Sequence, residues 1–260
     1  MTVKELYLAW EDPIDRKWLP VGLLTIDDNN IYRFVYTKGA ESSRNFVPLA
    51  RMDQLDKVYT SETLFPLFSN RLLSASRPEY ENYMEWLDVN KNEYDPLTVL
   101  AITEGIRGTD TFEVFPCPKP NDEGQYAVKF LSRGLRYLSE YVIERINNLQ
   151  KGDRLFIMPD IQNSYDPMAL ALRTDDPVEM VGYCPRYLSS DFYELLEKTR
   201  TIDIEVSVER INVDAPFRLR LLCKIVAPWP EGFKPCSAEE FKPLAGYDYE
   251  LKPLQKLRPL

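Results

Sequence analysis

One stretch of the sequence decides the fold: Asp160-Ile161-Gln162-Asn163-Ser164-Tyr165-Asp166-Pro167-Met168-Ala169-Leu170. It lies between two related stretches, Arg133-Gly134-Leu135-Arg136-Tyr137 upstream and Val181-Gly182-Tyr183-Cys184-Pro185-Arg186 downstream. Arginine, tyrosine and aspartate side chains therefore recur at the ends of apolar runs. Such side chains stack on flat rings, pair with phosphate and accept the proton of a hydroxyl.

The composition is that of a folded protein. The chain has 260 residues, of which 44% are hydrophobic, enough for one large or two small domains. No apolar run approaches the roughly 20 residues that span a bilayer, and the N-terminus lacks the apolar core of a signal peptide. We therefore expect a soluble, cytoplasmic protein that does not contact a membrane.

The residue types exclude several classes of enzyme. The chain has no histidine, which rules out Ser-His-Asp triads, Cys-His pairs and histidine-based zinc sites. The four cysteines form no C-x-x-C pair, so we expect reduced thiols and no metal. No glycine-rich phosphate-binding loop is present. We predict a protein that is not an enzyme and that uses no cofactor.

The charge is acidic but unevenly distributed. The net charge is −9, which opposes long-range attraction to DNA. Residues 125–226 contain 14 Lys and Arg and 15 Asp and Glu, a net of −1, so the acidic excess lies elsewhere. No basic stripe is present, and any nucleic-acid binding should be local and of modest affinity.

Alternating prolines mark a boundary. Residues 116–124, which run from Pro116-Cys117-Pro118 to Gly124, predict an extended linker. Before it, hydrophobic periodicity predicts strands over 5–10, 18–26, 31–36 and 112–115, helices over 64–73, 78–89 and 96–103, and a short linker or helix over 52–58. We interpret residues 1–115 as an α+β domain.

The second half of the chain is richer in strands. The pattern predicts strands over 126–131, 154–158, 169–173, 180–183, 202–212 and 217–226, and helices over 138–149 and 189–198. Ser189 or Ser190 is the expected N-cap of the last helix. The predicted fold class is α+β, with the N-terminal α+β domain followed by a small β-barrel over 125–226.

A proline-rich tail follows, over residues 227–260. Its aromatic residues are Trp229, Phe233, Phe241, Tyr247 and Tyr249. A free tail seldom contains so many aromatic side chains, so we expect this one to pack on a domain or a partner.

Four spaced elements now point to a family. The Arg133, Asp160 and Val181 stretches, with Gly152-Asp153 between the first two, resemble a HIRAN domain over about two fifths of the chain. The resemblance implies a modified, OB-like β-barrel. Some members of this family, joined to DNA-remodelling helicases, recognise the 3′-hydroxyl end of single-stranded DNA, and others are bacterial.

The resemblance implies six DNA-binding residues: Arg136, Tyr137, Tyr165, Asp166, Tyr183 and Arg186. Asp166 matches a carboxylate that accepts from the terminal hydroxyl. Tyr137 and Tyr165 match rings that stack on bases, and Arg136 and Arg186 match cations that hold phosphate.

Structural roles for the same residues stay open. Residues 163–167 contain only turn-forming types besides Tyr165, and they could form a turn without binding anything. Tyr183 stands where a helicase-linked member can have histidine, and it could be a packing residue, as could Arg186. We assign Gly134 and Gly182 to the backbone, with no chemistry.

The first half resembles the N-terminal subdomain of HipA-type toxin kinases. The matching stretches include Tyr32-Arg33-Phe34-Val35-Tyr36 and Leu64-Phe65-Pro66-Leu67-Phe68. In that family the subdomain makes protein contacts and holds no catalytic residue, and the kinase core has no counterpart here.

Two functions follow from these resemblances. The first is a non-enzymatic DNA-binding module for single-stranded DNA or 3′ ends, whose N-terminal domain contacts an unknown protein partner. The alternative is a protein-binding, antitoxin-like regulator of a HipA-type kinase or another effector. A carboxylate-dependent nuclease, the third possibility, has no clustered acidic motif to support it.

Overall fold

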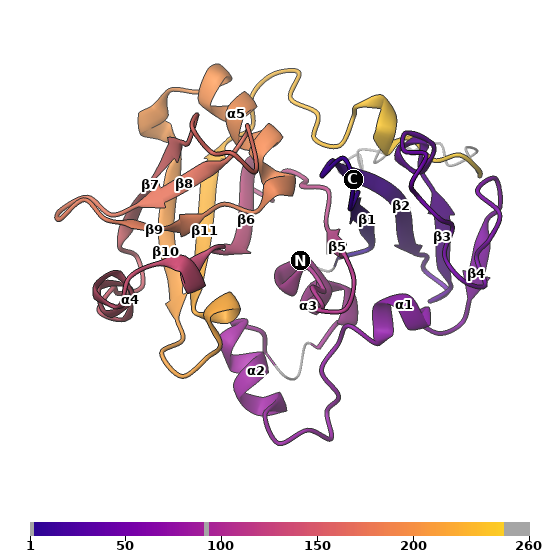
Figure 1. Ribbon diagram of the computed structural model, residues 1–260, viewed down its shortest axis with the longest axis horizontal. Helices are drawn as coiled ribbons and strands as arrows, with labels where there is room; N and C mark the ends of the chain where they lie inside the picture. The colour runs from indigo at the N-terminus through magenta and orange to yellow at the C-terminus, as the bar shows by residue number, and fades with distance from the viewer. Residues whose placement is uncertain (1–2, 91–93, 247–260) are drawn as a thin grey trace, which may run out of the picture.

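The computed structural model describes residues 3–90 and 94–246, and it contains two antiparallel sheets that lie side by side (Figure 1). The first sheet has the strand order β4-β3-β2-β1-β5 and the second β6-β11-β10-β7-β8-β9. We call residues 3–90 and 94–115 the first-sheet unit. Among the described residues, no helix has the length and apolar character needed to cross a membrane.

The first four strands of the first sheet lie side by side in chain order, and the fifth pairs with the first of them. Its strands are β1 (Glu5–Glu11), β2 (Trp18–Ile26), β3 (Tyr32–Tyr36), β4 (Tyr59–Ser61) and β5 (Phe112–Phe115). Three helices accompany it: α1 (Pro66–Ser69), α2 (Tyr80–Trp86) and α3 (Pro96–Thr103). Helix α3 starts where the sequence dictates, because Pro96 occupies its first turn and Asp95 accepts hydrogen bonds from two of its free backbone N–H groups.

The second sheet has six strands and is curled. Its strands are β6 (Gln125–Leu131), β7 (Arg154–Pro159), β8 (Leu170–Arg173), β9 (Met180–Tyr183), β10 (Glu205–Ile211) and β11 (Leu221–Pro228). Helix α4 (Glu140–Asn147) joins β6 to β7, and helix α5 (Arg186–Lys198) follows β9. The α5 residues Tyr187, Leu188, Phe192 and Leu195 pack into the core of this sheet.

The two edges of the second sheet meet at one end. Arg133, just after edge strand β6, forms a bridge with Tyr183, the last residue of the other edge strand, with N···O distances of 2.8 and 2.9 Å. Gly182 permits this approach: its φ is +118°, and a Cβ there would lie 2.1 Å from the Ser132 hydroxyl. The sheet is therefore a half-barrel whose edges are tied together beside Tyr183.

The first sheet has a buried cluster of its own, and another hydrophobic cluster runs across both sheets. Ala9 and Phe115 of the first sheet belong to the same buried cluster as Phe130, Phe192 and the other core residues of the second sheet. The Phe115 ring stacks on Tyr187 with their centroids 4.9 Å apart. A second shared cluster joins α2 and α3 to Leu131 and the β10–β11 connection. The predicted linker, residues 116–124, lies wholly in the described part of the chain and forms no helix or strand.

The described part of the tail returns to the first sheet. Trp229, Phe233 and Phe241 pack against the shared core. Beyond them, the chain pairs with the segment after β3, where Lys38 N donates to Lys242 O at 2.9 Å and Leu244 N to Tyr36 O at 2.8 Å. In Figure 1 this yellow segment passes from the second sheet over to the first. The predicted tail residues Tyr247 and Tyr249 lie outside the described residues.

The structure corrects three local predictions. Helix α5 begins at Arg186 and not near Ser189 or Ser190; Ser189 is buried inside the helix, and Pro185 precedes its first turn. The strand expected from residue 217 begins at Leu221, because residues 217–219 form a 3-10 turn after Pro216. The short edge strand β4 was not predicted; of the two alternatives for residues 52–58 before it, the structure has the linker and not the helix.

Candidate nucleic-acid interface

The loop between β7 and β8 is held in shape by its own side chains. The Asn163 side-chain oxygen accepts hydrogen bonds from the backbone N–H groups of Tyr165 and Asp166, both at 3.0 Å. One oxygen of Asp166 accepts from Met168 N at 3.0 Å, which continues the turn. Residues 163–167 thus form the turn that their composition indicates, and this turn places the Tyr165 ring at its tip with 82% of the residue exposed.

Asp166 is paired with Arg186. Its second carboxylate oxygen accepts a hydrogen bond from Arg186 Nε at 3.1 Å. Arg186 is the first residue of α5, and its Nη2 lies 3.4 Å from the Tyr165 carbonyl oxygen. The two side chains remain partly exposed, at 31% for Arg186 and 19% for Asp166, so a ligand can still reach them.

Tyr183 joins this loop to the turn after β6. Its hydroxyl donates to Asp160 Oδ2 at 2.9 Å, and its ring lies against Gly134, where an added Cβ would be 3.3 Å away. Burial raises the pKa of Tyr183, and the neighbouring Asp160 raises it further. The same hydrogen bond, helped by Asn163, lowers the pKa of Asp160. Tyr183 is thus partly buried, and its hydroxyl is already hydrogen-bonded to Asp160.

Arg136 and Tyr137 lie on the short 3-10 turn η3 (Leu135–Tyr137), directly after Gly134. The Arg136 guanidinium lies over the Tyr137 ring, 4.6 Å from its centroid, and also hydrogen-bonds the Tyr137 hydroxyl. Tyr137 is 75% exposed. The pair therefore presents a flat ring and a cation to solvent.

The six predicted residues gather at one end of the half-barrel. A continuous chain of contacts runs from Gly134 through Tyr183, Asp160 and Asn163 to the Asp166–Arg186 pair. Arg136 and Tyr137 follow Gly134, and Tyr165 precedes Asp166. Two exposed tyrosine rings thus accompany a central set of polar groups that are hydrogen-bonded to one another.

Three features of this surface were not predicted from the sequence. The loop also exposes apolar side chains, including Ile161 at 86% and Met168 at 43%. Arg133, in the same stretch as Arg136, points away from the site and pairs with the buried Glu104 of the first-sheet unit. Glu11 at the end of β1 lies 3.9 Å from Arg186 Nη1, so the first-sheet unit borders the site with a carboxylate.

A comparison with known families decides what this part of the chain is. Residues 125–230 match the family model of the HIRAN domain. Residues 125–230 are a HIRAN domain. The match begins where the sequence resemblance begins and ends four residues later, just past β11.

Two solved structures are similar to about two fifths of the chain at low identity. A crystal structure of a protein from Lactobacillus plantarum is 18% identical, covering 40% of this chain and 99% of its own, with a TM-score of 0.31. The HIRAN domain of human HLTF is 14% identical, covering 41% of this chain and 80% of its own, with a TM-score of 0.30. The comparison with curated proteins gives no match.

Within residues 3–90 and 94–246, no three His, Cys, Asp or Glu side chains group in a way that could hold a metal ion.

Proposed function

We propose that the HIRAN domain binds single-stranded DNA, with a preference for a free 3′ end. One observation carries this proposal. Two exposed tyrosine rings, Tyr137 and Tyr165, lie at the same end of the half-barrel as the Arg186–Asp166 ion pair. Rings of this kind stack on unpaired bases, at about 1–3 kcal/mol per base.

The ion pair can read a strand end without being broken. Each oxygen of Asp166 is used once, by Arg186 and by Met168 N, and a carboxylate oxygen accepts more than one hydrogen bond. A terminal 3′-hydroxyl can donate to the free lone pairs of Asp166. The guanidinium of Arg186, held in place by the same carboxylate, can face the phosphate next to that hydroxyl.

The proposal predicts which DNA ends bind. A 3′-phosphate places negative charge against Asp166 and removes the donor, so a strand with a 3′-hydroxyl should bind more tightly. Fluorescence anisotropy of short labelled single strands with 3′-hydroxyl, 3′-deoxy and 3′-phosphate ends, at low and moderate salt, measures this order. We expect modest affinity, because the HIRAN domain has no basic stripe.

Variants locate the binding surface in the same assay. Tyr165→Ala should weaken binding by about 1–3 kcal/mol, and Asp166→Asn should reduce the preference for the 3′-hydroxyl while keeping a side-chain oxygen for the turn. The matched control is Tyr141→Ala, which removes an exposed ring from α4. Dissociation constants near millimolar for every strand, or equal effects of the Tyr165 and Tyr141 variants, would contradict the proposal.

A second candidate is a protein-binding regulator that acts through the first-sheet unit. Its support is a pair of exposed apolar side chains, Ile14 at 72% and Val47 at 76%. They lie on two loops that buried Asp12 joins by accepting from Ser43 and Asn45. A partner found by co-purification should be lost from the full-length Ile14→Asp and Val47→Asp variants and retained by Tyr165→Ala; loss with Tyr165→Ala alone would assign the contact to the HIRAN domain.

A further inference from the structure

Two cysteines that are far apart in the sequence lie together beside the HIRAN domain. Cys117 is in the segment that enters the domain, and Cys236 is in the segment that leaves it. Both are free thiols of intermediate exposure, whereas Cys184 and Cys223 are buried in the core. The folded chain thus brings its two less buried thiols to the same place.

The Cys117 thiol lies beside the segment that contains Cys236. The Cys117 thiol donates to the carbonyl oxygen of Pro235, the residue before Cys236, at 3.5 Å. The Cys117 thiol is also the neighbour with the largest effect on Cys236, whose pKa it raises together with burial. Cys236 has a φ of +53°, in the left-handed region that favours glycine, so the backbone adopts an uncommon conformation at this cysteine.

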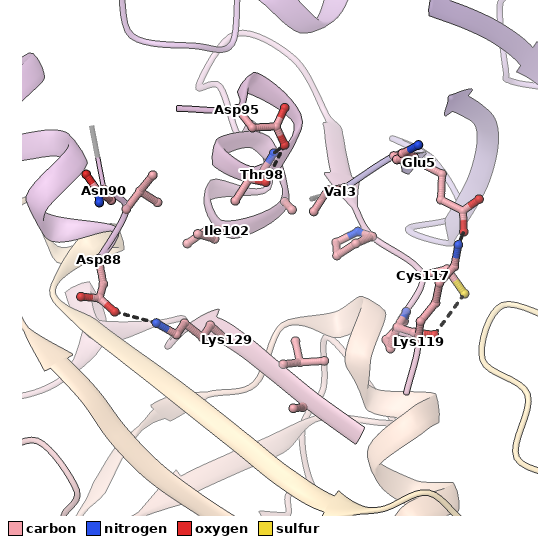
Figure 2. A pocket seen from close by; sticks show the side chains of 17 residues that line it. Val3, Glu5, Asp88, Asn90, Asp95, Thr98, Ile102, Cys117, Lys119 and Lys129 are labelled. Atoms are coloured by element: carbon pink, nitrogen blue, oxygen red, sulfur yellow. Dashed lines mark hydrogen bonds and ion pairs between the residues drawn. The ribbon is translucent and has the colours of Figure 1, made fainter. Parts of the chain in front are cut away.

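An open cleft gives access to Cys117. Cys117 lines a cavity of about 820 Å³ between α3 and β6, whose other lining residues include Glu5, Asp88, Lys119 and Lys129. Figure 2 shows the Cys117 sulfur at the border of this cavity, directed toward the C-terminal segment. Because Cys117 lines this open cleft, a small reagent can approach it from solvent.

We propose that Cys117 and Cys236 form a disulfide when the protein meets a low-molecular-weight disulfide. The thiolate of Cys117 attacks one sulfur of the reagent and releases one small thiol. Cys236 then loses its proton and attacks Cys117 in the mixed disulfide, releasing the second small thiol. Two protein thiols and one small disulfide become one protein disulfide and two small thiols, so atoms and electrons balance.

This bond encloses the HIRAN domain. The loop from Cys117 to Cys236 contains all of residues 125–230, so the disulfide fastens the entering and leaving segments of the domain to each other. A cross-link of this kind lowers the entropy of the unfolded chain and stabilises the fold. The disulfide should form slowly near neutral pH and faster as the pH rises, because the pKa of Cys236 is raised.

Oxidised glutathione at pH 8 provides the test on the full-length protein. After alkylation and proteolysis, mass spectrometry should find a Cys117–Cys236 cross-link, two of the four thiols lost, and both restored by dithiothreitol. The oxidised protein should also melt at a higher temperature than the reduced one. The Cys117→Ser and Cys236→Ser variants should show neither the cross-link nor the shift in melting temperature.

The wild-type protein alone can overturn the proposal. A glutathione adduct that persists on Cys117 without the cross-link, a bond that involves Cys184 or Cys223, or four unreacted thiols would each contradict it. Because these outcomes are read from the wild-type chain, they hold even where a serine variant fails to fold.

Discussion

At Asp166, the two oxygens of one carboxylate have different neighbours. One oxygen holds the turn through Met168 N, and the other holds Arg186. The structural and the functional interpretations of this residue are therefore compatible. A residue that shapes its loop and orients a cation is already fixed when a ligand arrives, which lowers the entropic cost of binding.

Asp191 is the residue whose environment most clearly couples stability to pH. It lies on α5, where burial raises the pKa of its carboxyl from 3.8 to about 7, opposed by a hydrogen bond from the Tyr126 hydroxyl and helped by Glu194. The folded protein holds this proton up to about pH 7, whereas the unfolded chain loses it near pH 4. Stability should therefore fall as the pH rises from about 4 to 7.

Asp191→Asn should remove this fall, because asparagine stays neutral and its oxygen can still accept from Tyr126. Urea unfolding at pH 5 and pH 8 measures the effect: the variant should gain on the order of 2–3 kcal/mol relative to wild type between these pH values. The exposed Asp214→Asn is the matched control. An equal pH dependence in wild type and Asp191→Asn would show that another group is responsible.

At the scale of elements, the sequence patterns predict strongly marked segments well and long-range contacts poorly. The bounds of α3 were predicted correctly because Pro96 and the residues after it mark its start locally. Ser189 was a wrong N-cap because the helix had already begun after Pro185, and its position in the core depends on the fold. Likewise, the spacing of the motifs assigned Asp166 and Arg186 to the same family pattern. Their direct ion pair was not predicted, because it depends on how the β7–β8 loop packs against α5.

The contact between β1 and α5 is one that no local pattern could predict. Glu11 ends β1 and lies 3.9 Å from Arg186, although it also pairs with Arg16 at 3.1 Å. A carboxylate at this distance competes with a phosphate for Arg186, by about 1 kcal/mol where the pair is solvated.

Glu11→Gln should therefore strengthen single-strand binding by up to about fivefold at low salt, and less at moderate salt. Anisotropy titrations at the two salt concentrations measure this, with Glu41→Gln on η1 (Lys38–Glu41) as a control for the change in net charge. The same gain in both variants would assign the effect to total charge and not to the position of Glu11.

At the scale of the whole molecule, the two sheets form one packed body. A shared hydrophobic cluster holds the two sheets against each other: Phe115 ends the first sheet and stacks on Tyr187 of α5. The contact is also ionic, because Arg133, whose backbone bridges to Tyr183, pairs through its side chain with the buried Glu104 of the first-sheet unit.

This ion pair should hold the first-sheet unit and the HIRAN domain together. Arg133→Ala leaves the Glu104 charge buried and unpaired, which should cost about 3–5 kcal/mol of unfolding free energy. Glu104→Ala should cost less, and adding it to Arg133→Ala should recover part of the loss. Guanidinium unfolding of the two single variants and the double variant gives the coupling, and strictly additive effects would mean that the pair does not act as a unit.

The return of the tail to the first sheet has a consequence for how the protein is made. Strands β1 to β5 leave the ribosome before the HIRAN domain, but Lys242 and Leu244, which pair beside β3, leave after it. The first sheet therefore acquires its last partners only when the middle of the chain has been synthesised and folded. In the order of synthesis, the HIRAN domain comes between the first-sheet unit and the segment that completes the packing around β3.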